Sequence, residues 1–359
     1  MSRPAKLIID IAALKHNFKK IKQYAPHQAI MAMIKADAYG HGAERVALAL
    51  TEADAFGVAS LEEGWVLRRA GIMQPIVLVE GLFAEQELDE AVKGQFTLVL
   101  HHHVQVDMLE RASIEKPITV WVKINTGMCR LGFATQDIPD LYSRLMRCPA
   151  IAKPMGWMTH FAEADDLHSD TTRQQVAVFA HTVANFPGPR SLANSAGILS
   201  WPIAHADCVR PGIMLYGISP FPHTIGLTYK LQPVMTLQAQ LIAIHTVKKG
   251  SRVGYGGIWT APEDTHIGVV SAGYGDGYPQ FTKNGTPVLV NGKICPLVGR
   301  VSMDMLTVDL RSQPEAKLGD VVVLWGRGLP IETIALASDT SAYELVARMT
   351  HRPSAQVIG

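Results

Sequence analysis

A lysine stands at the end of a strongly apolar segment near the N-terminus. The segment AIMAMI, residues 29–34, is followed directly by Lys35 and then by ADAYGHG. Lysine is almost never buried without a partner, because desolvating its charge is costly. Two interpretations are open from these residues alone. Lys35 is either a strand end that reaches solvent ahead of a tight turn at residues 40–42, or an amine in a pocket, ready to form a Schiff base.

Further polar residues stand at the ends of other strand-like segments. Lys123 lies late in ITVWVKIN, His160 closes AKPMGWMTHF, and Arg210 enters CVRPGIMLYG. Arg130 follows Lys123 in the next loop, and the complete set is Lys35, Lys123, Arg130, His160, Asn194, Ser195 and Arg210. Each alone is consistent with a solvated strand end. In a parallel barrel, however, catalytic side chains collect at the carboxyl ends of the strands, so the set indicates one active-site rim.

Small residues beside this rim suggest an anion site. Ser195, Gly212 and Ile213 can offer a hydroxyl and two backbone N–H groups to a phosphate, as late loops of such barrels often do. An amine and a phosphate site on one rim predict pyridoxal 5'-phosphate (PLP), with the Schiff base at Lys35.

The elements that position these residues alternate between apolar runs and amphipathic segments. Eight strand-like runs are expected in the first two thirds of the chain: AIMAMI, AFGVAS, PIVLVEG, FTLVLH, ITVWVKIN, AKPMGWMTHF, RSLANS and CVRPGIMLYG. Helix-like stretches separate them, which predicts an α/β fold with an N-terminal (β/α)8 barrel of the TIM type. RSLANS is the shortest and most polar of the eight.

The texture of the sequence changes after Gly217. Residues from about 231 to 325 are mostly strand-like, and the pair Asn291–Gly292 predicts a hairpin with a type I′ turn. SAYELVARM predicts a final helix. We therefore expect a PLP-binding barrel over residues 1–229 and a C-terminal β-rich domain over 230–359, with residues 1–10 as candidates to join the second domain.

Composition excludes several classes of protein. The 359 residues carry a net charge of +1, which does not favour nucleic acid or a membrane surface. No uncharged apolar run has the length of a membrane span. The four cysteines form no CxxC pair, and the adjacent residues His101–His103 cannot all face one ion, so we expect no metal site. A cytoplasmic enzyme is the expectation.

Seven longer motifs carry a specific resemblance. MIKADAYGHG, VKINTGMCRLGF, MTHFAEAD, LANSAG, VRPGIMLYG, VGYGG and GRVSMDM resemble the alanine racemases of bacteria, in that family's order and over nearly the whole chain. The resemblance implies a fold-type III PLP enzyme that interconverts L-alanine and D-alanine and supplies D-alanine for peptidoglycan. It also implies a head-to-tail homodimer whose active sites are shared across the interface.

The resemblance assigns a role to individual residues. Lys35 matches the lysine that carries the internal aldimine and serves as the base for the D-substrate. Tyr255 matches the second base, for the L-substrate, which reaches the active site from the partner chain. Arg210 matches the contact to the pyridine nitrogen, Arg130 the residue that bonds the phenolic oxygen, and His160 the imidazole beside the ring.

Other matches concern the pocket. Met303 matches the partner-chain residue whose backbone N–H meets the substrate carboxylate, with Asp304 beside it, and Lys123 matches a lysine that is often carbamylated. Tyr274 is a candidate to narrow the access channel. The residues expected to hold the phosphate or to line the pocket are Tyr39, Asn194, Ser195, Gly212, Ile213 and Tyr343.

The sequence departs from the family pattern at a few positions. Asn125 stands where the family usually has Asp, which removes a charge beside Lys123, and Ser302 stands where some members have Cys. His351 lies near a position where some members have a tyrosine, so the breadth of accepted substrates is open.

Other functions remain alternatives. They are a racemase of broader specificity for serine or other small amino acids, a PLP-dependent decarboxylase of the same fold, a non-catalytic PLP-binding protein, and, more distantly, a cofactor-free Schiff-base aldolase. Arg210 argues against the decarboxylase, because a permanent cation at the ring nitrogen keeps that nitrogen unprotonated. Tyr255 and the β-rich domain argue against the non-catalytic protein.

Overall fold

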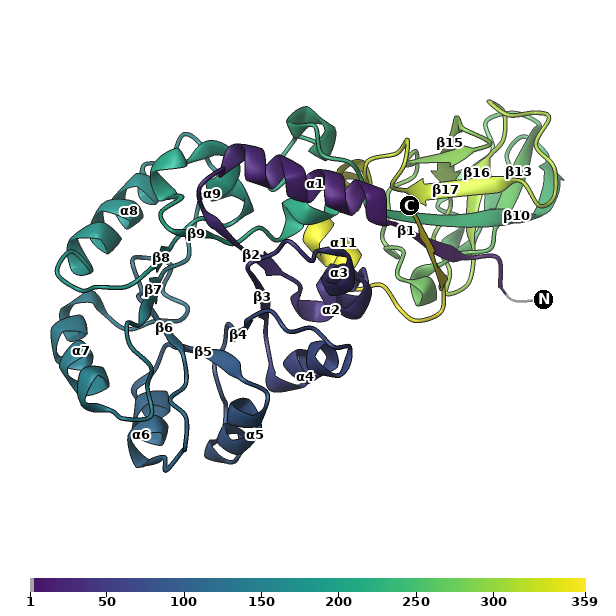
Figure 1. Ribbon diagram of the computed structural model, residues 1–359. Coiled ribbons are helices and arrows are strands. Elements are labelled where there is room, and N and C mark those ends of the chain that lie inside the picture. Colours follow the sequence, from purple (N-terminus) through teal and green to yellow (C-terminus); the bar gives the residue numbers. More distant parts are fainter. Residues whose placement is uncertain (1–2) are drawn as a thin grey trace. The chain divides into compact units, whose positions relative to one another are not determined.

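The computed structural model describes residues 3–359, which form two compact units (Figure 1). The barrel unit comprises residues 18–215 and 220–222. The β-rich unit comprises residues 3–17, 216–219 and 223–359. Helix α1 (Ile11–Tyr24) begins in the β-rich unit and ends in the barrel unit.

Eight parallel strands form the inner wall of the barrel unit. They pair in the order β8-β7-β6-β5-β4-β3-β2-β9, and Figure 1 shows them as a ring with helices outside it. The strands are β2 (Ala29–Met33), β3 (Ala55–Val58), β4 (Ile76–Leu78), β5 (Phe96–Leu100), β6 (Val120–Lys123), β7 (Gly156–Met158), β8 (Arg190–Ser191) and β9 (Cys208–Val209). All eight expected strands are present in this nearly closed TIM-like barrel, which confirms the predicted fold class.

Helices follow the strands around the barrel. Ser60 caps α4 by accepting a hydrogen bond from the Glu63 N–H, and Asn194 caps α9 in the same way through the Gly197 N–H. The helices of this unit after α1 are α2 (Lys35–Gly40), α3 (Ala43–Ala49), α4 (Leu61–Arg69), α5 (Leu88–Lys93), α6 (His103–Arg111), α7 (Ile138–Arg147), α8 (Thr171–Thr182) and α9 (Ser195–Ser200).

Side chains close the gap between β8 and β9. The Ser191 hydroxyl donates to the Cys208 carbonyl at 2.7 Å, and the Arg190 N–H donates to the Asp207 carboxylate at 2.8 Å. The interior is filled by apolar side chains from successive strands, among them Met31, Val99 and Met158. This packing makes the barrel a solid support for residues at its rim.

The β-rich unit is an antiparallel barrel. Its strands pair in the order β13-β16-β15-β14-β17-β10, and a further pairing of β10 with β13 closes the ring. The N-terminal strand β1 pairs with β10, and β18 pairs with β1. The strands are β1 (Lys6–Asp10), β10 (Met235–Val247), β13 (Thr265–Val270), β14 (Pro287–Val290), β15 (Lys293–Val298), β16 (Leu306–Asp309), β17 (Val321–Trp325) and β18 (Ser354–Ile358), with a separate pair β11 (Arg252–Val253) and β12 (Trp259–Thr260).

Two local predictions for this unit are confirmed. Strands β14 and β15 form a hairpin, and Asn291 and Gly292 both have positive φ, 48° and 78°, as a type I′ turn requires. The expected last helix is α11 (Ala342–Ala347), which follows α10 (Ile331–Ala337).

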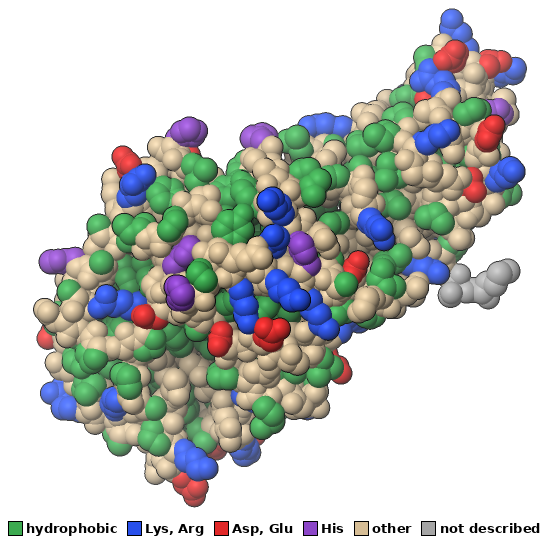
Figure 2. Space-filling model, turned by 45° about the horizontal axis from the view of Figure 1, so that its top comes forward, with side chains coloured by type: hydrophobic (Ala, Val, Ile, Leu, Met, Phe, Trp, Pro, Cys, Tyr) green, Lys and Arg blue, Asp and Glu red, His purple; other side chains and the backbone are tan. Residues whose placement is uncertain are grey.

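Two features of the described residues concern membrane spans and metal sites. None of the helices within residues 3–359 is long and apolar enough to cross a membrane. Over the same residues, His, Cys, Asp and Glu side chains do not gather in threes as a metal ion would need. Basic and acidic side chains both occur across the face drawn in Figure 2.

Candidate active site

The structure brings the barrel candidates to one rim. Lys35 follows β2, Lys123 ends β6, His160 lies just beyond β7, and Arg210 directly follows β9. Because neighbouring parallel strands point the same way, these residues share the carboxyl edge of the barrel. Their charges influence one another. Burial is the largest cause of the lowered pKa of Lys123, and the nearby cations Arg210, Arg130 and Lys35 lower it further.

Lys35 opens an unusual segment of backbone. The four residues after it, Ala36–Tyr39, all have φ between 51° and 54°, so they form one turn of left-handed helix. For residues with a Cβ this conformation costs about 1–2 kcal/mol each. A left-handed turn of this kind persists only where contacts with the surrounding protein hold the backbone in place. Lys35 is half-buried at the start of this turn.

Three side chains hold the left-handed turn. The Glu63 carboxylate accepts hydrogen bonds from the N–H groups of Ala36 and Ala59, both at 2.7 Å. The Asp37 carboxylate accepts one from the Ala43 N–H at 2.7 Å. Burial lowers the pKa of His41 to about 4, so its ring is neutral and can donate from Nδ1 to nearby carbonyls. Glu63 could not be named from the sequence, since only folding brings it to the residue after Lys35.

Arg210 is the most strongly fixed cation of the rim. Its side chain is buried, at 6% exposed. It donates to the Ser191 hydroxyl and to the Thr159 carbonyl, both at 2.6 Å, and to the Leu192 carbonyl at 3.2 Å. Burial lowers the pKa of Arg210 to about 10, which still leaves it charged near neutral pH. These bonds use Nη1 and Nη2, so within residues 3–359 its Nε–H remains available as a donor.

Burial and the cations of the rim lower the pKa of the neighbouring bases. Burial, followed by the charges of Arg210 and Lys123, holds the pKa of His160 well below its usual range. Lys123 is buried too, and its pKa falls to about 8 because of burial and the charges of Arg210, Arg130 and Lys35. A concentration of positive charge with so few carboxylates favours an anionic ligand.

Ser195, Gly212 and Tyr39 meet beside the rim. The Ser195 hydroxyl accepts hydrogen bonds from the Gly212 N–H at 3.0 Å and from the Met214 N–H at 3.4 Å. A Cβ at Gly212 would lie 2.6 Å from the Tyr39 hydroxyl oxygen, so a larger residue does not fit. Burial raises the pKa of Tyr39 to about 12, which keeps its hydroxyl protonated as a donor.

The loop after Lys123 explains one departure from the family pattern. The Asn125 side-chain oxygen accepts hydrogen bonds from the N–H groups of Gly127 and Cys129, at 3.1 and 3.0 Å. The Phe133 N–H donates to the Lys123 carbonyl at 2.9 Å, which ties the loop back to β6. The neutral amide of Asn125 thus shapes the loop that carries the exposed Arg130, and it adds no charge there.

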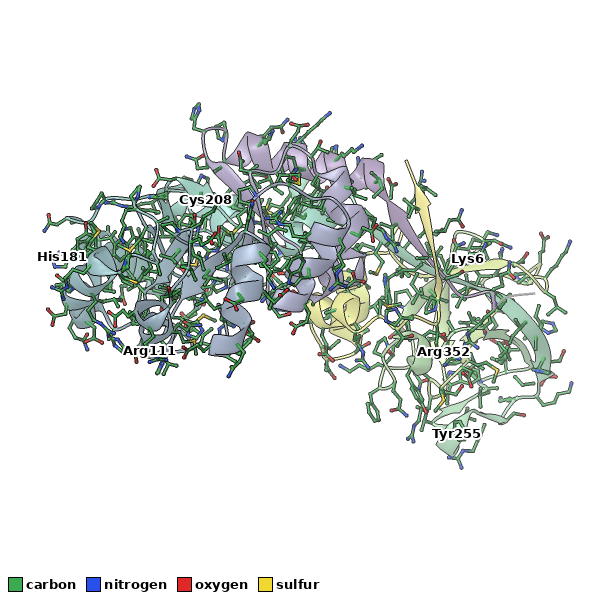
Figure 3. All side chains as sticks on the ribbon, turned by 60° about the horizontal axis from the view of Figure 1, so that its bottom comes forward. Lys6, Arg111, His181, Cys208, Tyr255 and Arg352 are labelled. Carbon is green, nitrogen blue, oxygen red and sulfur yellow. The ribbon has the colours of Figure 1, made fainter. Side chains whose placement is uncertain are left out.

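The β-rich unit holds a second group of candidates. Tyr255 lies between β11 and β12 and is 69% exposed; Figure 3 shows it at the margin of this unit. It lines a hollow of about 550 Å³ together with Arg300, Ser302 and Met305. Met303, 53% exposed, lies in the same turn as Ser302.

Two of the remaining candidates join this second group. The Tyr274 N–H donates to the Ser302 carbonyl at 3.0 Å, and Asp304 follows Met303 in the turn. Tyr343 stands on α11 and is not among the residues that line the hollow.

Comparisons with known proteins cover the whole chain. Residues 9–220 match the family described as "Alanine racemase, N-terminal domain", and residues 234–357 match "Alanine racemase, C-terminal domain". The chain is 48% identical over 344 residues to an alanine racemase of Aeromonas hydrophila and 50% identical over 344 residues to one of Shewanella woodyi. Each match covers 96% of both chains.

Solved structures show the same similarity. The biosynthetic alanine racemase of Pseudomonas aeruginosa is 41% identical and superposes with a TM-score of 0.96, covering 99% of this chain and all of the other. The alanine racemase of Acinetobacter baumannii is also 41% identical, with a TM-score of 0.91 and the same coverage.

Proposed function

The chain belongs to the alanine racemase family of isomerases, and we propose that it interconverts L-alanine and D-alanine by a two-base mechanism. Members of this family depend on PLP. The observation that carries the proposal is the rim of the barrel unit, which brings the amine of Lys35 and the buried guanidinium of Arg210 to one edge.

The residues of the rim fit PLP as a cofactor. Lys35 would hold it covalently, and the spare Nε–H of Arg210 suits an unprotonated ring nitrogen as acceptor. Ser195, Ile213, Tyr39 and the space preserved at Gly212 suit the phosphate. When bound, PLP would supply an electron sink for the negative charge that develops at Cα of alanine, so the α-proton would become acidic enough to remove.

Two side chains of different chemistry would move the proton. The amine of Lys35, free while the substrate takes its place, would remove or return the proton on the D-face, and Tyr255 would do so on the L-face, the arrangement that general acid–base catalysis of racemisation requires. Arg210 stays protonated near neutral pH, so it would donate to the ring nitrogen and would not pass a proton on to it. This arrangement limits competing chemistry such as transamination or decarboxylation.

We propose that Tyr255 acts on the site of a second copy of the chain. Its exposure of 69% leaves the phenol accessible to such a copy. The Met303 N–H would bind the substrate carboxylate, while Arg130 of the other copy would bond the phenolic oxygen of the cofactor. A carbamate on Lys123 would orient Arg130, and the lowered pKa of Lys123 favours the neutral amine, which attacks carbon dioxide and releases a proton.

The physiological role in this proposal is the supply of D-alanine for peptidoglycan by a cytoplasmic homodimer. The test is incubation of the PLP-loaded protein with L-alanine, D-alanine, L-serine and L-lysine, followed by chiral chromatography and measurement of carbon dioxide release. Racemisation of alanine in both directions supports the proposal, and turnover of serine would broaden it. Carbon dioxide from lysine, or no reaction with any amino acid, would contradict it.

A further inference from the structure

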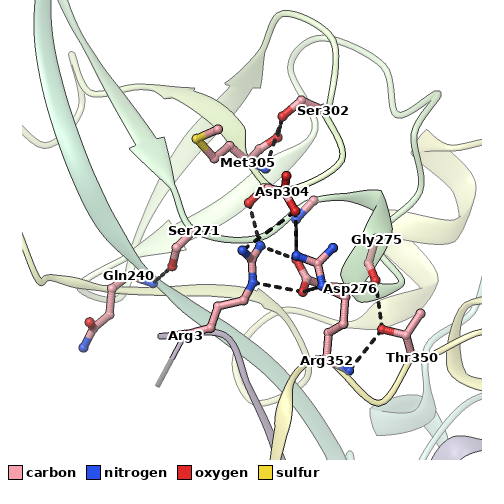
Figure 4. Close-up of polar contacts among 11 residues, drawn as sticks. Arg3, Gln240, Ser271, Gly275, Asp276, Ser302, Asp304, Met305, Thr350 and Arg352 are labelled. Carbon is pink, nitrogen blue, oxygen red and sulfur yellow. Dashed lines mark hydrogen bonds and ion pairs between the residues drawn. The ribbon is translucent and has the colours of Figure 1, made fainter. Parts of the chain in front are cut away.

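A network of two arginines and two aspartates lies beneath the turn that carries Met303 (Figure 4). We define the carboxylate clamp as Arg3, Asp276, Asp304 and Arg352. Asp276 is completely buried, at 0% exposed, and a buried carboxylate is tolerated only when it is paired. Arg3 pairs with it through two hydrogen bonds, at 3.1 and 2.7 Å, and Nε of Arg352 lies 3.6 Å from it.

The same two arginines also donate hydrogen bonds to Asp304, in the turn that carries Met303. Arg3 donates to the Asp304 carbonyl at 2.7 Å, and Arg352 donates to the Asp304 carboxylate at 2.5 Å. Asp276 therefore fixes two guanidinium groups whose other N–H groups hold the residue next to Met303. Bidentate arginine contacts define direction as well as distance, so this connection is stiff.

Backbone contacts complete the connection between the two segments. The N–H of Gly275 donates to the carbonyl of Met303 at 2.9 Å, and the Asp276 carboxylate accepts from the Gly273 N–H at 2.9 Å. A Cβ at Gly273 would lie 2.3 Å from the Ser302 carbonyl oxygen, so the segments pack at the closest approach that backbone allows. Ser302 and Met305 close the turn itself. The Ser302 hydroxyl donates to the Met305 carbonyl at 2.7 Å and accepts from the Met305 N–H at 3.2 Å.

We infer that Asp276, acting through Arg3 and Arg352, is the positioning residue that sets where the Met303 N–H points and thereby how tightly the substrate carboxylate binds. This inference rests on the proposed function, which gives that N–H its ligand. Asp276 itself touches no substrate. Its effect therefore falls on substrate binding in both directions of the reaction.

The chain offers a matched control in the same unit. Asp309 is also a buried carboxylate, at 2% exposed, and it accepts a hydrogen bond from Nε of Arg311 at 2.9 Å. Its side chain has no hydrogen bond to residues 302–305. Asp309→Asn removes a comparable buried charge while leaving the carboxylate clamp intact.

The test compares Asp276→Asn, the milder Arg3→Gln, and Asp309→Asn in the PLP-loaded enzyme. For Asp276→Asn we expect KM for both alanine enantiomers, and Ki for propionate, which is alanine without its amine, to rise about tenfold while kcat changes little. Arg3→Gln should shift the same constants in the same direction. Asp309→Asn should leave KM and Ki unchanged, even if it lowers the melting temperature as much as Asp276→Asn does.

Amide hydrogen exchange gives a readout that needs no turnover. Exchange over residues 302–305 should accelerate in Asp276→Asn and stay at the wild-type rate in Asp309→Asn. If Asp276→Asn and Arg3→Gln lose stability but keep KM, Ki and the exchange rate of the wild type, the inference is wrong and the proposed function stands. An inactive wild-type protein would contradict the proposed function, and the exchange comparison would then decide whether the clamp holds the turn.

Discussion

The barrel unit and the β-rich unit present their candidate residues in opposite ways. In the barrel unit Arg210 is buried and donates hydrogen bonds to Ser191, Thr159 and Leu192, and Lys123 is buried among cations. In the β-rich unit Tyr255 and Met303 are 69% and 53% exposed. The barrel thus fixes its site residues inside one chain, whereas the β-rich unit fixes the backbone and leaves the side chains accessible.

This difference separates two kinds of preorganisation. Buried hydrogen-bonded groups have their position and charge state set by the fold, so replacing one should affect stability as well as chemistry. Replacing an exposed side chain on a rigid turn can change the chemistry with little effect on the stability of the fold. The comparison would therefore fail if a buried variant lost activity without losing stability, or if an exposed variant lost stability.

The largest effect is expected at Lys35. Lys35→Ala should lower racemisation in both directions by at least about a thousandfold, because it removes both the attachment point and one base. A chiral assay measures the rate, and the exposed Lys93→Ala, which loses only an ion pair with Glu90, should keep wild-type activity. Full activity of Lys35→Ala without an added amine would exclude the proposed role.

Tyr255 provides the second test, on the exposed side of the comparison. Tyr255→Phe should lower conversion of L-alanine by about 100-fold to 10,000-fold, the range for loss of a general base. The melting temperature should not change, because the hydroxyl lies on an exposed side chain. Tyr24→Phe, at another exposed tyrosine, is the control, and equal rates for the two variants would remove Tyr255 from the mechanism.

Arg210 tests the buried side through stability. Arg210→Lys keeps the charge but cannot reproduce the planar fork that reaches Ser191, Thr159 and Leu192. We expect a loss of roughly 4 kcal/mol in the free energy of unfolding, since buried acceptors lose their donors. Arg111→Lys, at an exposed pair with Glu85, should cost less than about 0.5 kcal/mol in the same urea titration.

Lys123 gives the smallest effect and a definite pH dependence. The pKa of Lys123 is about 8 in the folded protein and 10.5 in the unfolded chain. Between pH 8 and pH 10.5 the unfolded chain therefore binds more protons than the folded one. Wild-type stability should therefore rise with pH across this window. Lys123→Met should be more stable than wild type near pH 7, by about 2 kcal/mol, and lose that advantage above about pH 10.

The measurement for Lys123 is urea unfolding in buffer free of carbon dioxide. A stability difference between wild type and Lys123→Met that stays constant from neutral to alkaline pH would show that the lysine is not desolvated in the folded protein.

Much of the fold was predictable because its signals are local. Apolar runs such as FTLVLH marked barrel strands, and Asn291–Gly292 marked the hairpin. The left-handed turn after Lys35 was not predicted, since Ala36–Tyr39 contain no glycine and only Asp37 among them is of a type that readily adopts positive φ. It depends on Glu63, Asp37 and His41, which only the folded chain assembles.

The candidate site divides in the same way. The rim residues could be named from sequence because they stand at the ends of strand-like runs or in the loops that follow them. The carboxylate clamp could not, because Arg3 and Asp276 are 273 residues apart and neither belongs to a motif that suggests the other. Pairings of this kind become visible only when distant segments pack together.

Proton NMR in deuterated water tests the two-base proposal most directly. L-alanine and D-alanine are incubated separately with the PLP-loaded protein, and the α-proton signal is followed alongside the enantiomer ratio. The proposal predicts that each enantiomer loses its α-proton signal as the opposite enantiomer appears. A protein that retains PLP but exchanges the α-proton of neither enantiomer would contradict it.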